Sequence, residues 1–120
     1  NVNIEFIKAD IFQYKSDKKY DIIVSNPPYV TESEKSLMKK NVLNFEPELA
    51  LFVDDENNLK YYDSILNFSQ LCLKKIGFLY FEINENSKTE MITFLKNNRY
   101  QNIEVISDTK GKNRFIKCSK

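Results

Sequence analysis

The feature that most restricts the fold is a run of apolar and β-branched residues that two consecutive prolines cut short. Residues 20–25 read Tyr-Asp-Ile-Ile-Val-Ser, and Asn26-Pro27-Pro28 follows directly. Because proline has a fixed φ and no backbone N–H, neither ring can continue a hydrogen-bonded ladder. The pattern predicts a buried parallel strand whose C-terminal end carries a rigid loop.

Other segments alternate between the patterns of strands and helices. Residues 3–7 alternate polar and apolar side chains before Asp10, which predicts a short strand followed by an acidic loop. The same periodicities predict an amphipathic helix that begins at Tyr61 and stops at Gly77, and then a strand at 78–83. A capping box of Ser87 and Glu90 predicts a helix that ends at Asn98. Strands 102–107 and 114–118 are predicted to form an antiparallel hairpin at a sheet edge.

The segment from residue 29 to residue 57 has weak periodicity. Thr31 and Glu34 have the spacing of a capping box, which predicts a short helix through Met38. A connection of this length in a compact domain is typical of a functional lid.

This order of elements predicts an α/β fold with a mainly parallel sheet, helices on its faces and a C-terminal antiparallel hairpin. With 120 residues, of which 42% are hydrophobic, the chain can form one core and is expected to be one domain. It has neither a run of about 18 apolar residues that would span a bilayer nor a signal-peptide pattern, so a cytoplasmic location is expected.

The charge weakly disfavours a nucleic-acid substrate, and the residue types exclude several kinds of catalysis. The 18 basic and 17 acidic residues give a net charge of +1 and provide no basic surface for a nucleic-acid backbone. The chain has no histidine, which removes Ser-His-Asp and Cys-His catalysis and most catalytic zinc sites. Cys72 and Cys118 are not spaced as metal ligands and are expected to be reduced thiols, so no metal site is predicted.

The proline loop carries groups that would help an amide or aromatic amine nitrogen to attack a methyl group. The lone pair of such a nitrogen is delocalised, so acceptors must draw the nitrogen toward tetrahedral geometry. The Asn26 side-chain oxygen and the Pro27 carbonyl can each accept one proton of an NH2 group, and Tyr29 can stack on the flat substrate. A stiff structural turn is the simpler interpretation. The position after a buried strand, where open α/β sheets bind ligands, favours catalysis.

Two sequence blocks resemble known methyltransferases. Residues 21–30, Asp-Ile-Ile-Val-Ser-Asn-Pro-Pro-Tyr-Val, resemble the fourth motif of class I enzymes that act on amino nitrogens. Residues 44–52, Asn-Phe-Glu-Pro-Glu-Leu-Ala-Leu-Phe, resemble a block of the HemK family of protein N5-glutamine methyltransferases, and the match covers nearly the whole chain. Ile76 and Asn84 depart from it, because each stands where the family usually has glycine.

The resemblance implies the second half of a Rossmann-like class I methyltransferase sheet, with S-adenosyl-L-methionine as the cofactor. It implies as substrate the glutamine amide of the Gly-Gly-Gln motif in class I peptide chain release factors. Catalytic roles fall on Asn26, Pro27, Pro28 and Tyr29, cofactor contacts on Asp10, Ile11 and Asn26, and substrate contacts on residues 26–29 with Glu46 and Pro47. A solvated glutamate and a turn proline are the alternative for the last two residues, and Glu82 has both a surface and a functional interpretation.

A complete enzyme of this class needs a glycine-rich loop and an acidic residue on its first two strands. This chain has two glycines, Gly77 and Gly111, so residues 1–120 are expected to be a partial catalytic domain that is inactive alone. The strand at 3–7 would lack its neighbours and either detach or pair elsewhere, including on another copy of the chain.

Two further functions remain as alternatives. An N6-adenine nucleic-acid methyltransferase presents a similar NH2 group to a similar loop, although the near-neutral charge favours a protein substrate. A noncatalytic binding domain would explain the lack of a glycine loop.

Overall fold

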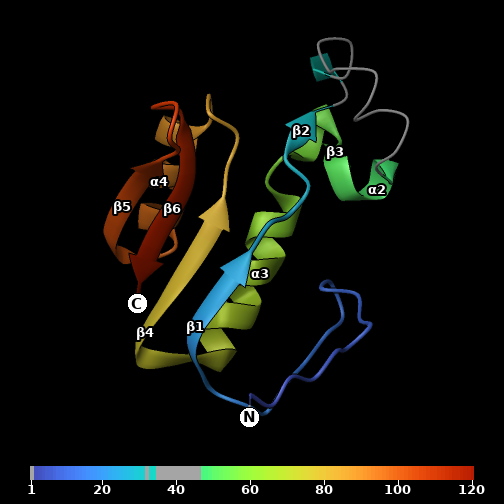
Figure 1. Ribbon diagram of the computed structural model, residues 1–120, viewed down its shortest axis with the longest axis vertical. Coiled ribbons are helices and arrows are strands. Elements are labelled where there is room, and N and C mark those ends of the chain that lie inside the picture. The colour runs from blue at the N-terminus through green and yellow to red at the C-terminus, as the bar shows by residue number, and fades with distance from the viewer. Residues whose placement is uncertain (1, 32, 35–46) are drawn as a thin grey trace.

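The computed structural model describes residues 2–31, 33–34 and 47–120, and its main sheet has the strand order β1-β4-β6-β5 (Figure 1). These strands are β1 (Tyr20–Ser25), β4 (Leu73–Glu82), β6 (Asn113–Ser119) and β5 (Gln101–Ser107). β1 runs parallel to β4, whereas β6 is antiparallel to both β4 and β5. Three strands therefore point the same way and β6 is reversed. This confirms the predicted α/β fold with its terminal hairpin at one edge.

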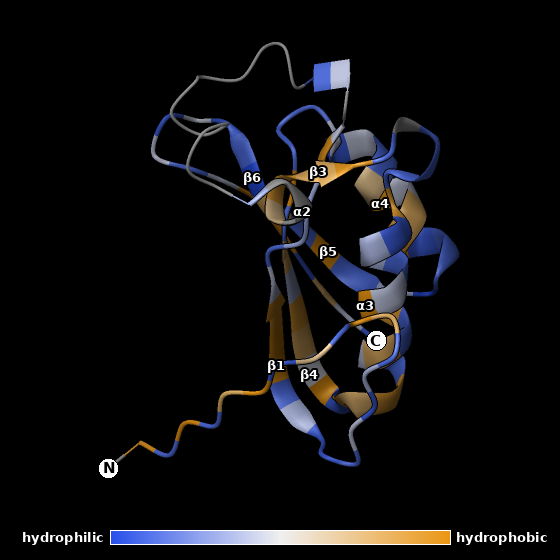
Figure 2. Ribbon diagram, turned by 90° about the vertical axis from the view of Figure 1, so that its right-hand side faces the viewer, coloured by the Kyte–Doolittle hydropathy of each residue, from blue (hydrophilic) through white to orange (hydrophobic). Residues whose placement is uncertain are grey.

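Two helices cover one face of this sheet. α3 (Lys60–Cys72) and α4 (Lys88–Asn97) lie on the same side, as Figure 2 shows. Their apolar residues meet the inward side chains of the central strands. The fully buried core includes Leu66, Leu79, Phe81, Ile83, Met91, Leu95 and Ile116. The helical and strand periodicities of the sequence thus produce a single core between one helix layer and the sheet.

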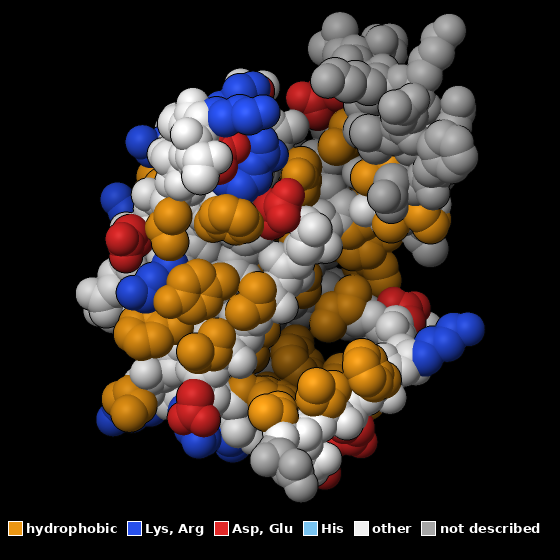
Figure 3. All heavy atoms as spheres, in the orientation of Figure 1, with side chains coloured by type: hydrophobic (Ala, Val, Ile, Leu, Met, Phe, Trp, Pro, Cys, Tyr) orange, Lys and Arg blue, Asp and Glu red, His pale blue; other side chains and the backbone are white. Residues whose placement is uncertain are grey.

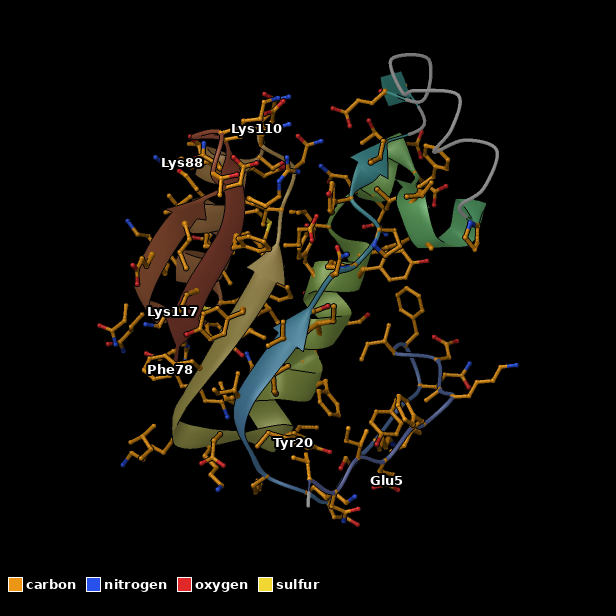
Figure 4. The ribbon with its side chains drawn as sticks, in the orientation of Figure 1. Glu5, Tyr20, Phe78, Lys88, Lys110 and Lys117 are labelled. Carbon is orange, nitrogen blue, oxygen red and sulfur yellow. The ribbon has the colours of Figure 1, made fainter. Side chains whose placement is uncertain are left out.

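The face of the sheet opposite the helices is open in the described part of the chain. β1, the strand that ends at the two prolines, was predicted to be buried, and this prediction is wrong for its side chains on the open face. Ile22 is 56% exposed and Val24 74% exposed. β1 is an edge strand, so a run of β-branched residues does not by itself specify two covered faces. Hydrophobic side chains gather on this side in Figure 3, and Lys117 Nζ lies 4.5 Å from the ring centroid of Phe78 (Figure 4).

Residues 2–10 form no strand, which corrects the prediction for residues 3–7. Phe6 is 93% exposed and Ile4 66% exposed, and no described strand pairs with this segment. An isolated strand leaves its backbone groups and apolar side chains in water, so it has little to stabilise it. The exposed ion pair between Glu5 and Lys18 (2.5 Å) contributes little. Detachment, one of the expected outcomes, is what the structure shows.

The junction between α3 and β4 lies earlier than predicted. The helix ends at Cys72, and Leu73 adopts an extended conformation that starts the strand, so Gly77 lies inside β4 rather than at a helix end. The pairing between β1 and β4 shifts register between Tyr20 and Ile22. A Cβ on Gly77 would lie 2.8 Å from the Asp21 carbonyl oxygen, so glycine permits this close approach.

α4 begins where predicted, but its capping box does not form. Ser87 occupies the N-cap position without a side-chain hydrogen bond to the helix. The Glu90 carboxylate instead accepts from Asn58 Nδ2 at 3.2 Å. Burial of the apolar face, and not capping, therefore stabilises this helix: Met91 and Leu95 are fully buried.

The predicted lid contains short elements where the structure describes it. β2 (Val30–Thr31) pairs in parallel with β3 (Phe52–Val53), and α2 (Glu48–Leu51) and η2 (Asp55–Asn57) flank β3. Glu34 accepts from the Thr31 N–H at 3.2 Å, as the proposed capping box requires. The rest of the helix predicted through Met38 lies outside the described residues. No described helix is long and apolar enough to cross a membrane.

Candidate functional site

A groove of about 1000 Å³ lies at the C-terminal end of β1. Its lining comes from the loop before β1, the end of β1, the α2 region and the start of α3: Lys8, Ala9, Asp10, Ile11, Phe12, Ser25, Asn26, Pro27, Pro28, Pro47, Ala50, Tyr61 and Ile65. Figure 3 shows a hollow lined by hydrophobic side chains between the sheet and the N-terminal segment. The groove brings together six predicted site residues that are far apart in the sequence: Asp10, Ile11, Asn26, Pro27, Pro28 and Pro47.

The proline loop presents one polar side chain to this groove. Pro27 is buried and Pro28 half-buried, whereas Asn26 is exposed. β1 ends at Ser25, which pairs with Phe81, so the loop starts from a fixed point on the sheet. Within the described part of the chain, no hydrogen bond engages the Asn26 amide. Its oxygen is therefore available to accept from a ligand.

Asp10 organises the opposite side of the groove. Its Oδ1 accepts from the Phe12 N–H at 3.0 Å, and its carbonyl accepts from the N–H groups of Gln13 (3.0 Å) and Tyr14 (2.8 Å). This compact turn is typical of aspartate, whose side chain readily bonds the backbone two residues later. The acidic loop predicted from the sequence is thus present, and the carboxylate stays exposed.

Sequence reasoning missed the aromatic wall of the groove. Phe12 and Tyr61 lie with ring centroids 5.0 Å apart, and both line the groove. Tyr61 begins the amphipathic stripe of α3, and the sequence pattern assigns it no separate role. The helical periodicity does not tell whether an aromatic ring lines a groove or is buried in the core, because rings of both kinds lie on the apolar face of the helix.

These residues fit an adenosine-containing cofactor in chemical terms. The Phe12 and Tyr61 rings provide flat apolar surface for a purine, and the exposed Asp10 carboxylate provides an acceptor for an amino or hydroxyl group. Gly77 and Gly111 are absent from the groove lining, so the described residues supply no glycine-rich turn. The described residues also contain no cluster of three metal-ligating side chains.

Tyr29 lies away from the groove lining. Its ring packs against the core, and its hydroxyl donates to Glu82 Oε1 at 2.7 Å. Burial, together with the Glu82 carboxylate, raises the pKa of Tyr29 to about 12, whereas the nearby Arg114 acts in the opposite direction. Tyr29 is thus a neutral hydrogen-bond donor at neutral pH.

Glu82 is held at the last position of β4. Its carbonyl accepts from the Tyr62 hydroxyl at 2.8 Å, and the next residue, Ile83, donates its N–H to the Arg114 carbonyl at 2.9 Å. The Arg114 guanidinium in turn lies 3.5 Å from the Asp108 carboxylate. Glu82 is therefore a half-buried member of an interaction network rather than a free surface carboxylate.

The remaining predicted substrate residues are partly described. Glu46 lies outside the described residues, and Pro47 lines the groove with an exposed side chain. Asn84, which departs from the HemK pattern, donates from Nδ2 to both Glu34 carboxylate oxygens at 3.3 and 3.2 Å. This contact joins the segment after β2 to the end of β4.

Comparisons with known proteins identify relatives that match the chain from end to end. No family model matches the sequence. A protein named release factor glutamine methyltransferase from Bacteroides thetaiotaomicron is 43% identical over all of this chain and 44% of its own length. The protein of the same name from Flavobacterium psychrophilum is 42% identical over 98% of this chain and 42% of its own length. A bifunctional methyltransferase from Rickettsia typhi is 33% identical over 97% of the chain and 22% of its own length. The chain therefore spans less than half of each relative.

Proposed function

We propose that this chain carries the acceptor side of a methyltransferase site, meaning the part that holds the nitrogen to be methylated. By sequence the chain belongs with the release factor glutamine methyltransferases, and it matches part of each of them. The cofactor is S-adenosyl-L-methionine, and the substrate is a class I peptide chain release factor methylated on the glutamine amide of its Gly-Gly-Gln motif. The observation that carries this proposal is the exposed Asn26 amide, which lines the groove beside a buried proline.

A primary amide is a weak nucleophile, and the loop must compensate for this. Its nitrogen lone pair is delocalised into the carbonyl, so two hydrogen-bond acceptors must orient the NH2 group. The Asn26 side-chain oxygen accepts one proton and the Pro27 carbonyl the other. The two proline rings fix φ at adjacent residues and keep the carbonyl direction constant. Positioning of the nitrogen is thus the main contribution of this loop.

When bound, S-adenosyl-L-methionine supplies an electrophilic methyl group on a sulfonium. The Phe12 and Tyr61 rings would hold its purine, Asp10 would accept hydrogen bonds from its polar edge, and Ile11 would contribute apolar contact beside Asp10. Transfer would form the N–C bond, break the bond from the methyl carbon to the sulfonium sulfur and release a neutral thioether, and the amide nitrogen would lose one proton to water. No strong base is needed, which agrees with a sequence that has no histidine.

Two acceptor substrates distinguish this proposal from its nearest alternative. The complete gene product that carries this chain is incubated with methyl-labelled S-adenosyl-L-methionine and either a class I release factor or an adenine-containing DNA oligonucleotide. We expect label on the release factor and none on the DNA. Label on the DNA alone would instead assign an N6-adenine methyltransferase, and label on neither would support a noncatalytic role.

A further inference from the structure

We propose that Tyr29 acts as a positioning residue through its hydroxyl, and that Glu82 holds that hydroxyl so that the neighbouring Asn26 and Pro27 acceptors stay in place. We call Tyr29 and Glu82 the tyrosine anchor. This inference rests on the proposed function, because it names further residues that serve the same groove.

Tyr29 lies at the end of the acceptor loop. It is the third residue after Asn26, and the rings of Pro27 and Pro28 stiffen the chain between them. The loop is fixed at one end by the Ser25–Phe81 pairing of β1 and β4. The Tyr29 hydroxyl fixes its other end by donating to Glu82 Oε1 at 2.7 Å. Both fixed points lie on the end of β4, so the acceptor loop is held across two adjacent residues of one strand.

Contacts from two other elements support Glu82. Its backbone is held by the Tyr62 hydroxyl from α3 and by the pairing of Glu82 with Phe115 on β6. Arg114, the residue before Phe115, accepts from the Ile83 N–H through its carbonyl at 2.9 Å, and its guanidinium lies 3.5 Å from the Asp108 carboxylate. Asp108 is itself fixed, because its Oδ1 accepts from the N–H groups of Lys110 (2.8 Å) and Lys112 (3.0 Å). The terminal hairpin and α3 therefore both brace the acceptor loop.

The Tyr29 ring packs half-buried against the core and is absent from the lining of the groove, which includes residues 25–28. The hydroxyl is therefore the part of Tyr29 that ties the loop to β4. A hydrogen bond from a neutral phenol to a carboxylate is stronger than one between neutral groups. Its loss would let the loop move and would reduce the time that the two acceptors spend in productive geometry.

The test compares matched variants of the complete gene product in steady-state methylation of a release factor. Tyr29→Phe removes the anchoring hydroxyl, and we expect kcat to fall about tenfold while KM for the release factor and for the cofactor changes less than about twofold. Glu82→Ala should reproduce this loss. Glu82→Gln, which keeps a side-chain oxygen as acceptor, should recover kcat to within about threefold of wild type.

Tyr100→Phe is the matched control. It removes a phenol that bonds the buried Ser69 hydroxyl, far from the loop in sequence, and should leave kcat unchanged. A rise in KM for the release factor without a fall in kcat would assign Tyr29 to the substrate-binding wall and overturn the proposal. Equal kcat for Tyr29→Phe and Tyr100→Phe, or equal losses for Glu82→Gln and Glu82→Ala, would overturn it as well.

An independent readout separates the tyrosine anchor from the proposed function. Hydrogen exchange of the Tyr29 and Val30 amides should be faster in Tyr29→Phe than in wild type and unchanged in Tyr100→Phe. If wild-type protein transfers no methyl group, the proposed function fails while exchange still decides the anchor. Unchanged exchange in Tyr29→Phe would show that the hydroxyl does not hold the loop.

Discussion

At the residue scale, the proline loop combines one exposed side chain with a stiff backbone. Asn26 is exposed and Pro27 is buried, so the side chain that would contact a substrate stands beside a buried ring. Sequence alone predicted the stiffness, because it follows from the covalent geometry of proline. It did not predict the Tyr29–Glu82 bond, since the partners are 53 residues apart and no local pattern joins them.

Asn26→Ala is expected to lower kcat for methyl transfer by about a hundredfold, because the nitrogen loses an acceptor that acts in the transition state. Calorimetry should show cofactor affinity within about twofold of wild type, since the Asp10 side of the groove is untouched. Asn67→Ala serves as the control, because Asn67 lies on α3 outside the groove and bonds Asp63. Near-normal kcat in Asn26→Ala would remove Asn26 from the chemistry.

At the element scale, the two long helices and the terminal hairpin were predictable because each carries a clear apolar period. The predicted boundary between α3 and β4 was wrong, because these two elements join without a turn. Residues 73–77 are as compatible with the end of a helix as with the start of a strand, and the glycine suggested a helix stop. The structure uses that glycine for close backbone approach instead, a tertiary requirement that periodicity does not record.

Gly77→Ala is therefore expected to destabilise the fold by about 1–3 kcal/mol, the usual cost of forcing an atom into packed space. The new Cβ would meet the Asp21 carbonyl and the Leu73 side chain, both at 2.8 Å. Urea unfolding measures the change. Gly111→Asn is the comparison, because nothing lies within 4 Å of a Cβ there and asparagine tolerates the φ of +77°. Equal stability of wild type and Gly77→Ala would show that β1 and β4 can move apart at no cost.

At the scale of the whole molecule, only part of the groove was predictable from the sequence. One predictable side is the C-terminal end of β1 with the proline loop, because a run of β-branched residues followed by two prolines predicts a strand that ends in a loop. The place of Pro47 and Tyr61 on the groove wall depends on how α2 and α3 pack, which the sequence pattern leaves open. The exposed Ile22 and Val24 show the same limit, because β-branched composition does not say which face of an edge strand is covered.

The position of the methyl group on the product tests most directly whether the proline loop serves a glutamine methyltransferase. A class I release factor is incubated with S-adenosyl-L-methionine and the complete gene product, then digested and mapped by tandem mass spectrometry, with this 120-residue chain alone as a parallel sample. We expect one added methyl group on the glutamine of Gly-Gly-Gln with the complete gene product and none with the chain alone. A methyl group on a different residue, or its absence after incubation with the complete gene product, would contradict the account.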